Sequence, residues 1–423
     1  MANALAARTS PALLPAADLS GTVPMRRVRV REVAPARNLS VVHVPSIAHI
    51  DPLAWNRLFP NSALDWGYLR GCERSNPEDF VLSALAVYDG DELVGGAPLF
   101  RLDYRLDTTL GASFKPVGDW LARHMPRLVR VPVIGMGSPM TEECQIGTLP
   151  GLSAERRLRV VEALLEGLDA HAEAEGVKIV ALKDVTDHDA TAMGDAMTAA
   201  GFARMASLPV ATLALPFATF DDYLKSLPSK MRTDIRSKLK RAARVEVEFR
   251  DNVDDIYDQI IAFYRATQAN RKTSYESFDS VPESYFREVM QSSGGKARML
   301  LCRLDGRLIG FAFFLEDQSR VDGKLLGLDY SVARELNLYF FIIMTMVQYC
   351  IERGVGEIQL GQTSYVVKRR LGAKLHRSWV YFKHRGRLLG PLFRFFGARL
   401  SFDAVDPDLA KLGEKVTYAD VGA

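Results

Sequence analysis

The chain has 423 residues, of which 48% are hydrophobic and 25% charged, and its formal net charge at pH 7 is +3. This length predicts two or three domains of about 100–200 residues each. The small net charge argues against a protein coated with nucleic acid, although a local basic site stays open. The cysteines contain no Cys-x-x-Cys pair, which argues against a zinc site or a disulfide framework and favours a reducing, cytoplasmic compartment. They are Cys72, Cys144, Cys302 and Cys350.

Two stretches decide whether the sequence predicts a signal peptide or a membrane-spanning helix. Residues 1–24 are rich in Ala, Pro and Ser and lack the basic start and uninterrupted apolar core of a signal peptide, so we expect a disordered leader. The longest apolar stretch without a charge, 336–351, has 16 residues. Because a membrane-spanning helix needs about 20, this stretch is predicted to be a buried helix.

The first half carries a hairpin, a long helix, a strand and a short helix, in that order. Residues 88–95 read YDGDELVG, and an Asp-Gly pair between β-rich runs predicts a tight hairpin turn. After an irregular stretch, residues 154–176 show a helical pattern that ends at a glycine, the expected stop of a helix. The strand at 177–184 then leads to a shorter helix that ends at Gly201.

The second half repeats this order. Residues 304–311 read LDGRLIGF, and a long helix, a strand and a short helix ending at Gly372 follow. From the hairpin glycine to the glycine after the long helix there are 81 residues in the first half (positions 95 to 176) and 44 in the second (310 to 354). The first half therefore carries an insertion of about 37 residues, which we place within 103–145. The shared order of four elements indicates an internal duplication.

This order of elements resembles the GNAT acyltransferase fold, and two such halves in one chain resemble the Fem family of peptidoglycan aminoacyltransferases. Three stretches carry the likeness. Residues 230–249 form a basic helix leading into the second half, and residues 263–272 end a helix with Tyr264 and Arg271 at the family's Tyr-to-Arg spacing. Residues 361–374 form a Gly-rich turn followed by Lys-x-x-Leu-Gly, where the family has an aromatic residue in place of the leucine.

The resemblance implies an α/β chain of two tandem GNAT-like domains, each with a mixed central sheet flanked by helices. We expect the leader at 1–24, the first GNAT-like domain at 25–210, the second at 211–390 and a C-terminal extension at 391–423. The second domain is expected to be catalytic. The first is expected to be degenerate, with an acceptor-binding or structural role.

In GNAT enzymes a tyrosine that protonates the leaving group often lies four residues before the closing glycine. The first half has Met197 at this position, which cannot donate a proton, whereas the second half has Lys368, which can. The resemblance therefore implies that Lys368 is catalytic, and Tyr365, one helical turn earlier on the same face, is expected to assist. Asp329 and Glu357 are possible carboxylate bases, although a structural role is expected for each.

Residues 229–244 contain seven basic side chains and one acid, and the apolar residues among them fall at helical spacing. Two interpretations stay open: a solvated charged face, or a grip on the phosphates of tRNA or of a nucleotide-linked acceptor. No interleaved aromatic residues indicate base stacking. The residues predicted to bind substrate are Lys230, Arg232 and Arg236 from this helix, and Arg271, Tyr330, Gln362, Arg369 and Arg370 around the second-half site.

The donor is left open by the absence of a standard phosphate loop. GNAT enzymes that use acetyl-CoA hold the pyrophosphate with a Gly-rich loop that opens the long helix, where backbone N–H groups face the anion. Residues 326–337 read LGLDYSVARELN, without that glycine spacing, and residues 134–147 contain glycines but also Glu142 and Glu143, which are expected to repel phosphate. No bound cofactor is expected. The co-substrate is an acyl-CoA, an acyl carrier protein or an aminoacyl-tRNA, the donor of the Fem family.

The predicted function is transfer of an acyl or aminoacyl group from such a donor to an amine or hydroxyl acceptor. The alternative is a non-catalytic binding module for tRNA or for an anionic cell-envelope precursor. No metal site or serine-triad enzyme is predicted, because the seven histidines show neither metal spacing nor a nearby Gly-x-Ser-x-Gly motif. No DNA partner and no transmembrane segment are predicted either. The basic amphipathic stretch 385–400 leaves peripheral membrane contact open, although packing on the body of the protein is expected.

Overall fold

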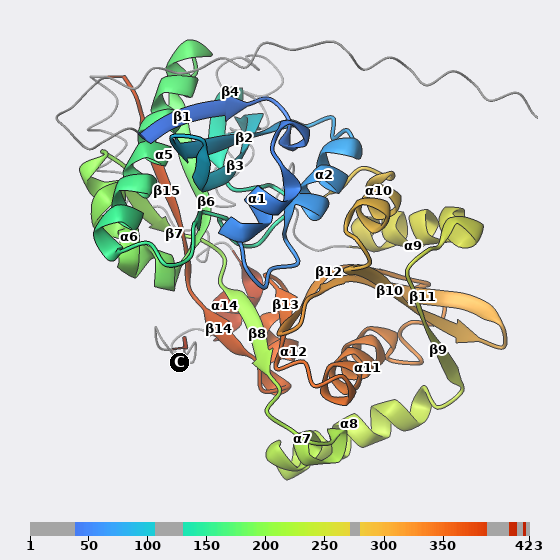
Figure 1. Ribbon diagram of the computed structural model, residues 1–423. Coiled ribbons are helices and arrows are strands. Elements are labelled where there is room, and N and C mark those ends of the chain that lie inside the picture. The colour runs from blue at the N-terminus through green and yellow to red at the C-terminus, as the bar shows by residue number, and fades with distance from the viewer. Residues whose placement is uncertain (1–38, 106–129, 271–279, 387–405, 413–417, 420–423) are drawn as a thin grey trace, which may run out of the picture.

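The computed structural model describes residues 39–105, 130–270, 280–386, 406–412 and 418–419 (Figure 1). Within these residues the chain forms two β-sheets, each covered by helices. The expected leader, most of the predicted insertion, Arg271 and most of the C-terminal extension lie outside the described residues.

The elements of the first half begin and end at local signals. Ser153 accepts a hydrogen bond from the backbone N–H of Arg156 and so caps the long helix, which stops before Gly176 at a φ of 68°. Gly90, with a φ of 62°, lies in the predicted hairpin turn. The elements are β1 (Leu39–Val44), η1 (Ile47–His49), α1 (Pro52–Leu58), α2 (Trp66–Arg74), β2 (Phe80–Asp89), β3 (Glu92–Arg105), β4 (Arg130–Met136), β5 (Gly147–Thr148), α5 (Ala154–Ala174), β6 (Ile179–Thr186), α6 (Asp187–Ala199) and β7 (Ala203–Ala206).

The second half follows the same rules. Asp305 and Gly306 have φ values of 52° and 78°, as a tight two-residue hairpin requires, and Gly354, with a φ of 71°, follows the long helix. The elements are β8 (Val210–Ala214), α7 (Phe220–Ser226), α8 (Ser229–Arg241), β9 (Val245–Arg250), η4 (Asp254–Ile256), α9 (Tyr257–Ala269), α10 (Tyr285–Ser292), β10 (Ala297–Leu304), β11 (Arg307–Glu316), β12 (Arg320–Leu328), α11 (Leu338–Glu352), β13 (Glu357–Gly361), α12 (Tyr365–Arg370), β14 (Lys374–His376), β15 (Ser378–His384) and α14 (Pro407–Leu412).

The two sheets have the same strand order, which the repeat predicted. The first sheet runs β1-β2-β3-β4-β6-β15-β7, with β5 paired to β3, and the second runs β9-β10-β11-β12-β13-β8-β14. In each sheet the fourth and fifth strands pair in parallel, while the other neighbours along the path are antiparallel. Two halves with one strand order are what a duplicated domain gives.

The two halves exchange one strand each. Strand β8 follows β7 in the sequence but pairs with β13 and β14 in the second sheet, and β15 follows β14 but pairs with β6 and β7 in the first sheet. The range predicted for the second domain, 211–390, thus contains β15, a strand of the first sheet. The short sequences VATLA of β8 and SWVYFKH of β15 carry no local mark of the sheet that each strand joins.

The two connections that cross between the sheets lie side by side. The backbone N–H of Ser207 donates to the carbonyl of Ser378 at 2.9 Å, and Ser378 Oγ donates to the carbonyl of Leu208 at 2.7 Å. The N–H of Asp187 donates to the carbonyl of Arg377 at 3.2 Å. These hydrogen bonds satisfy backbone groups of the crossing segments that would otherwise be buried without partners.

Helices cover both faces of the first sheet. A Cβ on Gly95 of β3 would meet Val160 of α5, whereas one on the next residue, Gly96, would meet Trp55 of α1. Because successive strand residues point to opposite faces, α5 and α1 lie on opposite sides of the sheet. The short helix α6 places Met197 in the core at 0% exposure.

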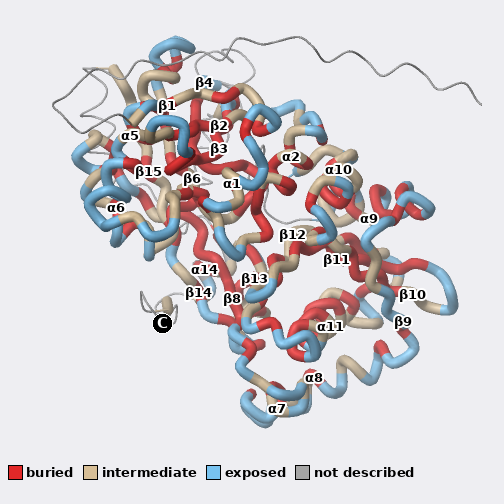
Figure 2. Tube along the Cα trace, in the orientation of Figure 1, coloured by how far each residue is buried: buried red, intermediate tan, exposed pale blue. Residues whose placement is uncertain are grey.

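One hydrophobic core joins the two domains through α2 and α10. It contains Tyr68 and Cys72 of α2 together with Tyr285 and Phe286 of α10 and Phe313 of β11. Figure 2 shows this buried zone continuing from the first sheet through α2 towards β11 and β12. The domains are therefore packed against each other through apolar side chains as well as through the exchanged strands.

Two glycines allow α2 and α10 to approach closely. A Cβ at Gly71 would lie 2.6 Å from Cα of Val289, and one at Gly67 would lie 2.5 Å from the carbonyl oxygen of Ser292. We expect Gly71→Val to lower the free energy of unfolding by about 2–3 kcal/mol, because overpacking at a backbone contact forces the helices apart. Chemical denaturation measures this change. Arg70→Val, on the same helix at a half-buried position, is the control and should change stability by less than about 1 kcal/mol.

The apolar stretch 336–351 forms most of α11, and nine residues of α11 are buried. The prediction of a buried helix is confirmed. Among the described residues, no helix is both long and apolar enough to cross a bilayer.

Candidate active site at the interface of the two domains

The second sheet opens between its two parallel strands. Strands β12 and β13 pair only from Arg320 with Glu357 to Asp322 with Gln359. Strand β12 continues to Leu328 along β11, and on its other side it has no β partner beyond Asp322 among the residues that the structure describes. Its residues 323–326 are half-buried, whereas the residues that flank them are buried. We call this stretch the open edge of β12.

A loop of the first domain reaches the open edge. Residues 138–145, which we call the carboxylate loop, follow β4 and carry Glu142 and Glu143. Oε2 of Glu142 lies 2.6 Å from Nζ of Lys324 on β12, and the Lys324 side chain is only 3% exposed. A carboxylate beside a buried ammonium offsets the cost of removing that charge from water. The two domains therefore share an ion pair at the open edge.

Lys368 of α12 belongs to the same electrostatic cluster and is 3% exposed. Burial lowers the pKa of Lys368 from 10.5 to about 7, and the negative charges of Glu142, Asp406 and Asp408 act against this shift. An amine with a pKa near 7 is present in both protonation states at neutral pH, which is what a general acid or base requires.

This cluster makes a prediction about Glu142. Glu142→Gln should lower the pKa of Lys368 below about 7, because Glu142 is the strongest of the charges that raise it. Titration of the lysine side chain by NMR measures the shift without any need for substrate. Glu143→Gln is the matched control, because Glu143 pairs with Arg320 and is not among the charges that act on Lys368. An unchanged Lys368 pKa in the Glu142→Gln variant would contradict the coupling.

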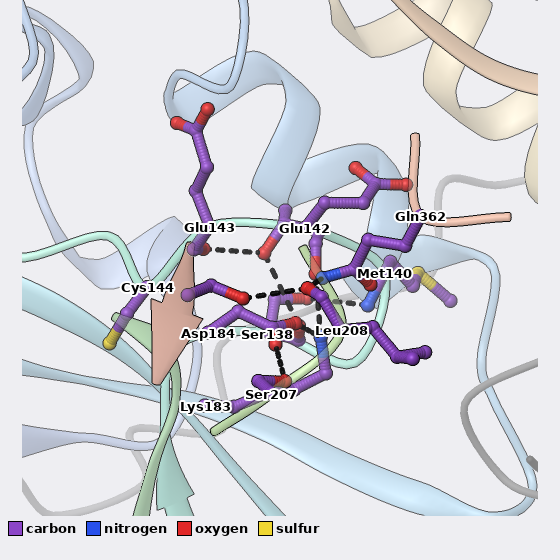
Figure 3. A network of polar contacts seen from close by, with 12 residues as sticks. Ser138, Met140, Glu142, Glu143, Cys144, Lys183, Asp184, Ser207, Leu208 and Gln362 are labelled. Carbon is purple, nitrogen blue, oxygen red and sulfur yellow. Dashed lines mark hydrogen bonds and ion pairs between the residues drawn. The ribbon is translucent and has the colours of Figure 1, made fainter. Parts of the chain in front are cut away.

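The carboxylate loop is fixed to the first domain by buried polar contacts (Figure 3). The backbone N–H of Cys144 donates to the carbonyl of Asp184 at 2.8 Å, and the Lys183 amine donates to the carbonyl of Thr141 at 2.7 Å. The Asp184 carboxylate accepts a hydrogen bond from Ser207 Oγ at 2.6 Å. Figure 3 shows the carboxylates of the loop pointing away from these contacts. Buried polar groups whose hydrogen bonds are satisfied hold a loop in one conformation. The backbone positions that carry Glu142 and Glu143 are therefore fixed.

Two buried tyrosines support the same loop. Tyr68 of α2 donates its hydroxyl proton to the carbonyl of Met140 at 2.7 Å, and its oxygen lies 3.1 Å from that of Tyr285 on α10. Burial raises the pKa of both hydroxyls well above 10, so both stay neutral at physiological pH. The ring of Tyr68 also lies 5.7 Å from Nζ of Lys324. These contacts hold the loop, α2 and α10 together at the domain interface.

A second ion pair crosses the interface beside the first. Arg320 of β12 lies 2.8 Å from Glu143 and donates to Asp322 at 2.6 Å. Burial raises the pKa of Asp322 to about 6, although Arg320 acts against this shift. The sequence predicted that Glu142 and Glu143 repel a phosphate. In the structure each of these carboxylates forms an ion pair with a cation of the other domain, Lys324 or Arg320.

The first sheet has no such opening among its described residues. Strands β4 and β6 pair in parallel from Val133 with Ile179 to Met136 with Leu182. The carboxylate loop then lies between the two strand ends, where Cys144 binds the backbone of β6. The position that is open in the second sheet is therefore filled in the first.

Besides Lys368, the structure brings four predicted residues together around β13 and α12, but in different environments. Tyr365 is fully buried and its hydroxyl donates to the carbonyl of Pro209 at 2.8 Å. This hydrogen bond ties Tyr365 to the segment that crosses between the sheets, and its assistance to Lys368 stays a prediction. Gln362 donates to the carbonyl of Leu208 at 2.9 Å, which gives it a packing role. Arg369 is half-buried and Arg370 is exposed.

The other predicted substrate-binding residues lie apart from this group. Tyr330 follows β12 and is 43% exposed. Lys230, Arg232 and Arg236 lie on α8, which packs beside α7 and α11. Arg271 lies outside the described residues. The predicted site residues thus include the buried Lys368, the exposed Tyr330 after β12 and three basic residues on α8.

The two candidate bases have structural surroundings. Asp329 lies 2.9 Å from Arg307 and accepts hydrogen bonds from the N–H and hydroxyl of Ser331. Burial alone would raise the pKa of Asp329, but these partners outweigh it and the pKa is lowered, which makes the carboxylate a weaker base. Glu357 lies at the start of β13, at the far end of the paired segment from the open edge.

Sequence reasoning missed Glu142 as a partner and Lys324 altogether. The signal for Lys324 was a lone lysine inside the strand sequence RVDGKLLGL, where a buried ammonium needs a carboxylate. The described residues contain no group of three or more His, Cys, Asp and Glu side chains placed to hold a metal ion.

Residues 229–369 match a family model described as an acetyltransferase (GNAT) domain. The matched span runs from α8 to α12 and includes both Lys324 and Lys368. The predicted resemblance to GNAT acyltransferases is confirmed.

Solved structures share the fold over most of the chain. FemX aligns with a TM-score of 0.54 at 14% identity, over 82% of this chain and 98% of FemX. The C-terminal domain (DUF2156) of a protein named as a lysylphosphatidylglycerol synthetase from Agrobacterium fabrum aligns with a TM-score of 0.51 at 12% identity, over 82% of this chain and 95% of that domain. These likenesses concern the fold, and with the GNAT match they confirm the predicted pair of tandem GNAT-like domains.

Curated relatives match only part of the chain. Two proteins of Mycobacterium tuberculosis, from strains CDC 1551 and H37Rv, carry the name 8-amino-7-oxononanoate synthase 2 and are 24% identical over 234 residues. The match covers 53% of this chain and 30% of each relative, so the chain spans about a third of the length of the curated relatives that it matches.

Proposed function

We propose that this chain is a GNAT-type acyl- or aminoacyltransferase whose reaction takes place at the open edge of β12. The observation that carries the proposal is the ion pair of Lys324 and Glu142 at the strand edge that β13 leaves unpaired, together with the buried Lys368 on which the charge of Glu142 acts. The GNAT family match over these strands supports the reaction class. The substrate classes considered for this chain are an acyl-CoA, an acyl carrier protein or an aminoacyl-tRNA as donor, and an amine or hydroxyl as acceptor.

The open edge suits a donor that carries amides in an extended chain. An unpaired strand edge presents N–H and C=O groups to any chain that can pair with them. The two amides of a phosphopantetheine arm, carried by coenzyme A or by a carrier protein, have this character. Lys324 is close to the point at which such a chain would enter, because it is the second residue of β12 beyond the last pair with β13.

The reaction replaces one acyl bond by another. The acceptor nitrogen or oxygen forms a bond to the acyl carbon, the carbonyl becomes an oxyanion, and the bond to the leaving sulfur or oxygen then breaks. Charged Lys368 stabilises the oxyanion and gives a proton to the leaving group. We assign to Glu142, whose side chain is 21% exposed, the removal of the proton that the acceptor loses. The first domain would then act by supplying Glu142.

Incubation of the protein with each donor class and a set of amine and hydroxyl acceptors, followed by mass spectrometry, tests the proposal. With one of the donors we expect a product whose mass equals that of the acceptor plus the acyl group minus one hydrogen atom. If no donor gives a product while tRNA or an anionic envelope precursor binds tightly, the chain is a binding module instead. Cytoplasmic action stays a prediction.

A further inference from the structure

The segment 220–244, which forms α7 and α8, concentrates the positive charge of the chain. It contains eight Lys or Arg residues and three Asp residues, a net charge of +5. The whole chain carries +3, so the remaining residues together carry −2. The net positive charge of the chain therefore comes from this segment of the second domain and not from the rest of the sequence.

Part of this charge is not neutralised by neighbouring acids. Arg236 pairs with Asp221 at 2.8 Å and Lys238 pairs with Asp234 at 2.7 Å. Within the described part of the chain no carboxylate forms an ion pair with Arg232, whose guanidinium instead donates to a backbone carbonyl of α7. The same holds, over the described residues, for Lys230, Lys240 and Arg241.

An apolar groove of about 320 Å³ lies beside this helix, between α8, β9 and α11. Leu239 of α8 lines it, and Arg232, seven residues earlier, lies on nearly the same face of the helix. Val247 of the edge strand β9 is 37% exposed in the groove. The other lining residues are Phe220, Phe249, Phe341, Met344, Thr345, Gln348, Tyr349 and Glu352.

This surface lies near the start of α11. Nζ of Lys238 lies 4.5 Å from the ring centroid of Phe340, in the first turn of α11. Tyr223 of α7 donates its hydroxyl proton to the carbonyl of Leu371, which follows α12 and its Lys368. In Figure 1, α7 and α8 lie on the far side of α11 from the first domain. A partner seated on α8 would thus contact the second domain alone.

We propose that α8 and this groove form the docking surface for an acidic carrier protein that presents the acyl donor. The inference rests on the proposed function. Unpaired cations along α8 complement an acidic partner, and the adjacent groove accepts apolar side chains of a partner helix, as in helix-in-groove recognition. A nucleic acid would use the cations but not the apolar groove. A bilayer is flat and could fill the recess only by releasing a lipid chain into it.

The test measures binding of a fluorescently labelled holo acyl carrier protein to the full chain, without any turnover. We expect Arg232→Glu with Lys240→Glu to weaken binding at least tenfold and Val247→Asp to weaken it several-fold, with affinity falling as salt rises. Lys178→Glu, an exposed position of the first domain, is the matched control and should bind like the wild type. Circular dichroism confirms that each variant is folded.

Three results would overturn the docking surface: no binding of the carrier protein, binding that the variants leave unchanged, or variant-sensitive binding of tRNA or phosphatidylglycerol vesicles in place of the carrier protein. The proposed function fails separately, if no donor gives a product. Carrier binding without turnover with any donor would reject the proposed function but support the docking surface. Turnover without carrier binding would support the function and reject the docking surface.

Discussion

Lys368→Met is expected to lower turnover about a hundredfold or more while the protein stays folded. An ammonium directed at a developing oxyanion in a site from which water is excluded contributes about 3 kcal/mol to transition-state stabilisation. Steady-state kinetics with the productive donor measures the loss. We expect kcat to fall more than KM rises, because the group acts in the chemical step rather than in binding.

Two controls accompany this variant. Lys374→Met replaces an exposed lysine on β14 and should keep wild-type turnover. Met197→Leu changes the residue of the first half that corresponds to Lys368 in sequence, with little change in volume, and it too should keep turnover. A folded Lys368→Met protein with turnover close to that of the wild type would remove Lys368 from the mechanism.

The pH dependence of the same variant provides a second measurement. Folding lowers the pKa of Lys368 from 10.5 to about 7, so between these values the unfolded chain binds more protons than the folded chain. The contribution of Lys368 to the unfolding free energy therefore rises with pH from about 7 to 10.5, and the rise is absent in Lys368→Met. If the charged amine is the acid in the reaction, wild-type turnover falls as pH rises above about 7.

Removal of strand β15 is expected to unfold the first domain, although the strand lies far from that domain in the sequence. A chain that ends at Arg377 lacks β15, which lies between β6 and β7 and pairs with both. The first sheet then has exposed edges at β6 and β7, and Tyr381, which is 1% exposed in the core, is lost. We expect aggregation, or a midpoint of thermal unfolding lower by more than about 10 °C.

A chain that ends at Gly386 is the matched control, because it keeps β15 and lacks everything after it. Comparison of the two truncated chains isolates the strand from the rest of the C-terminal region. Equal unfolding midpoints for the two chains would show that the first domain does not depend on β15.

Much of the fold follows from local signals in the sequence. The Asp305-Gly306 turn, the glycines that end α5 and α11, and the buried apolar stretch of α11 each depend on residues that are neighbours in the chain. The repeated order of these elements predicted the shared strand order. The strand exchange could not be predicted in this way, because the choice of sheet for the short strands β8 and β15 depends on contacts between distant segments.

In the candidate site, too, features that depend on local spacing were predicted, and contacts between distant residues were not. Lys368 was predicted from its distance to a glycine, a local spacing. The partner of Lys324 is Glu142, 182 residues away in the chain, and no periodicity connects the two. Tyr365 was predicted on the face of Lys368 from helical spacing alone, but the crossing segment at Pro209 covers it. Helical spacing reports the face on which a side chain lies but not its burial by a distant segment.

The paired crossing segments at Ser207 and Ser378 have a consequence for how the chain responds to heat and to ligands. Since each sheet contains a strand whose chain continues into the other sheet, neither domain can lose its order without removing a strand from its neighbour. The two domains then form one cooperative unit with a single melting transition. A donor bound only at the second domain stabilises both domains by the same free energy, so a spectroscopic probe in the first domain would report occupancy of a site that it does not touch.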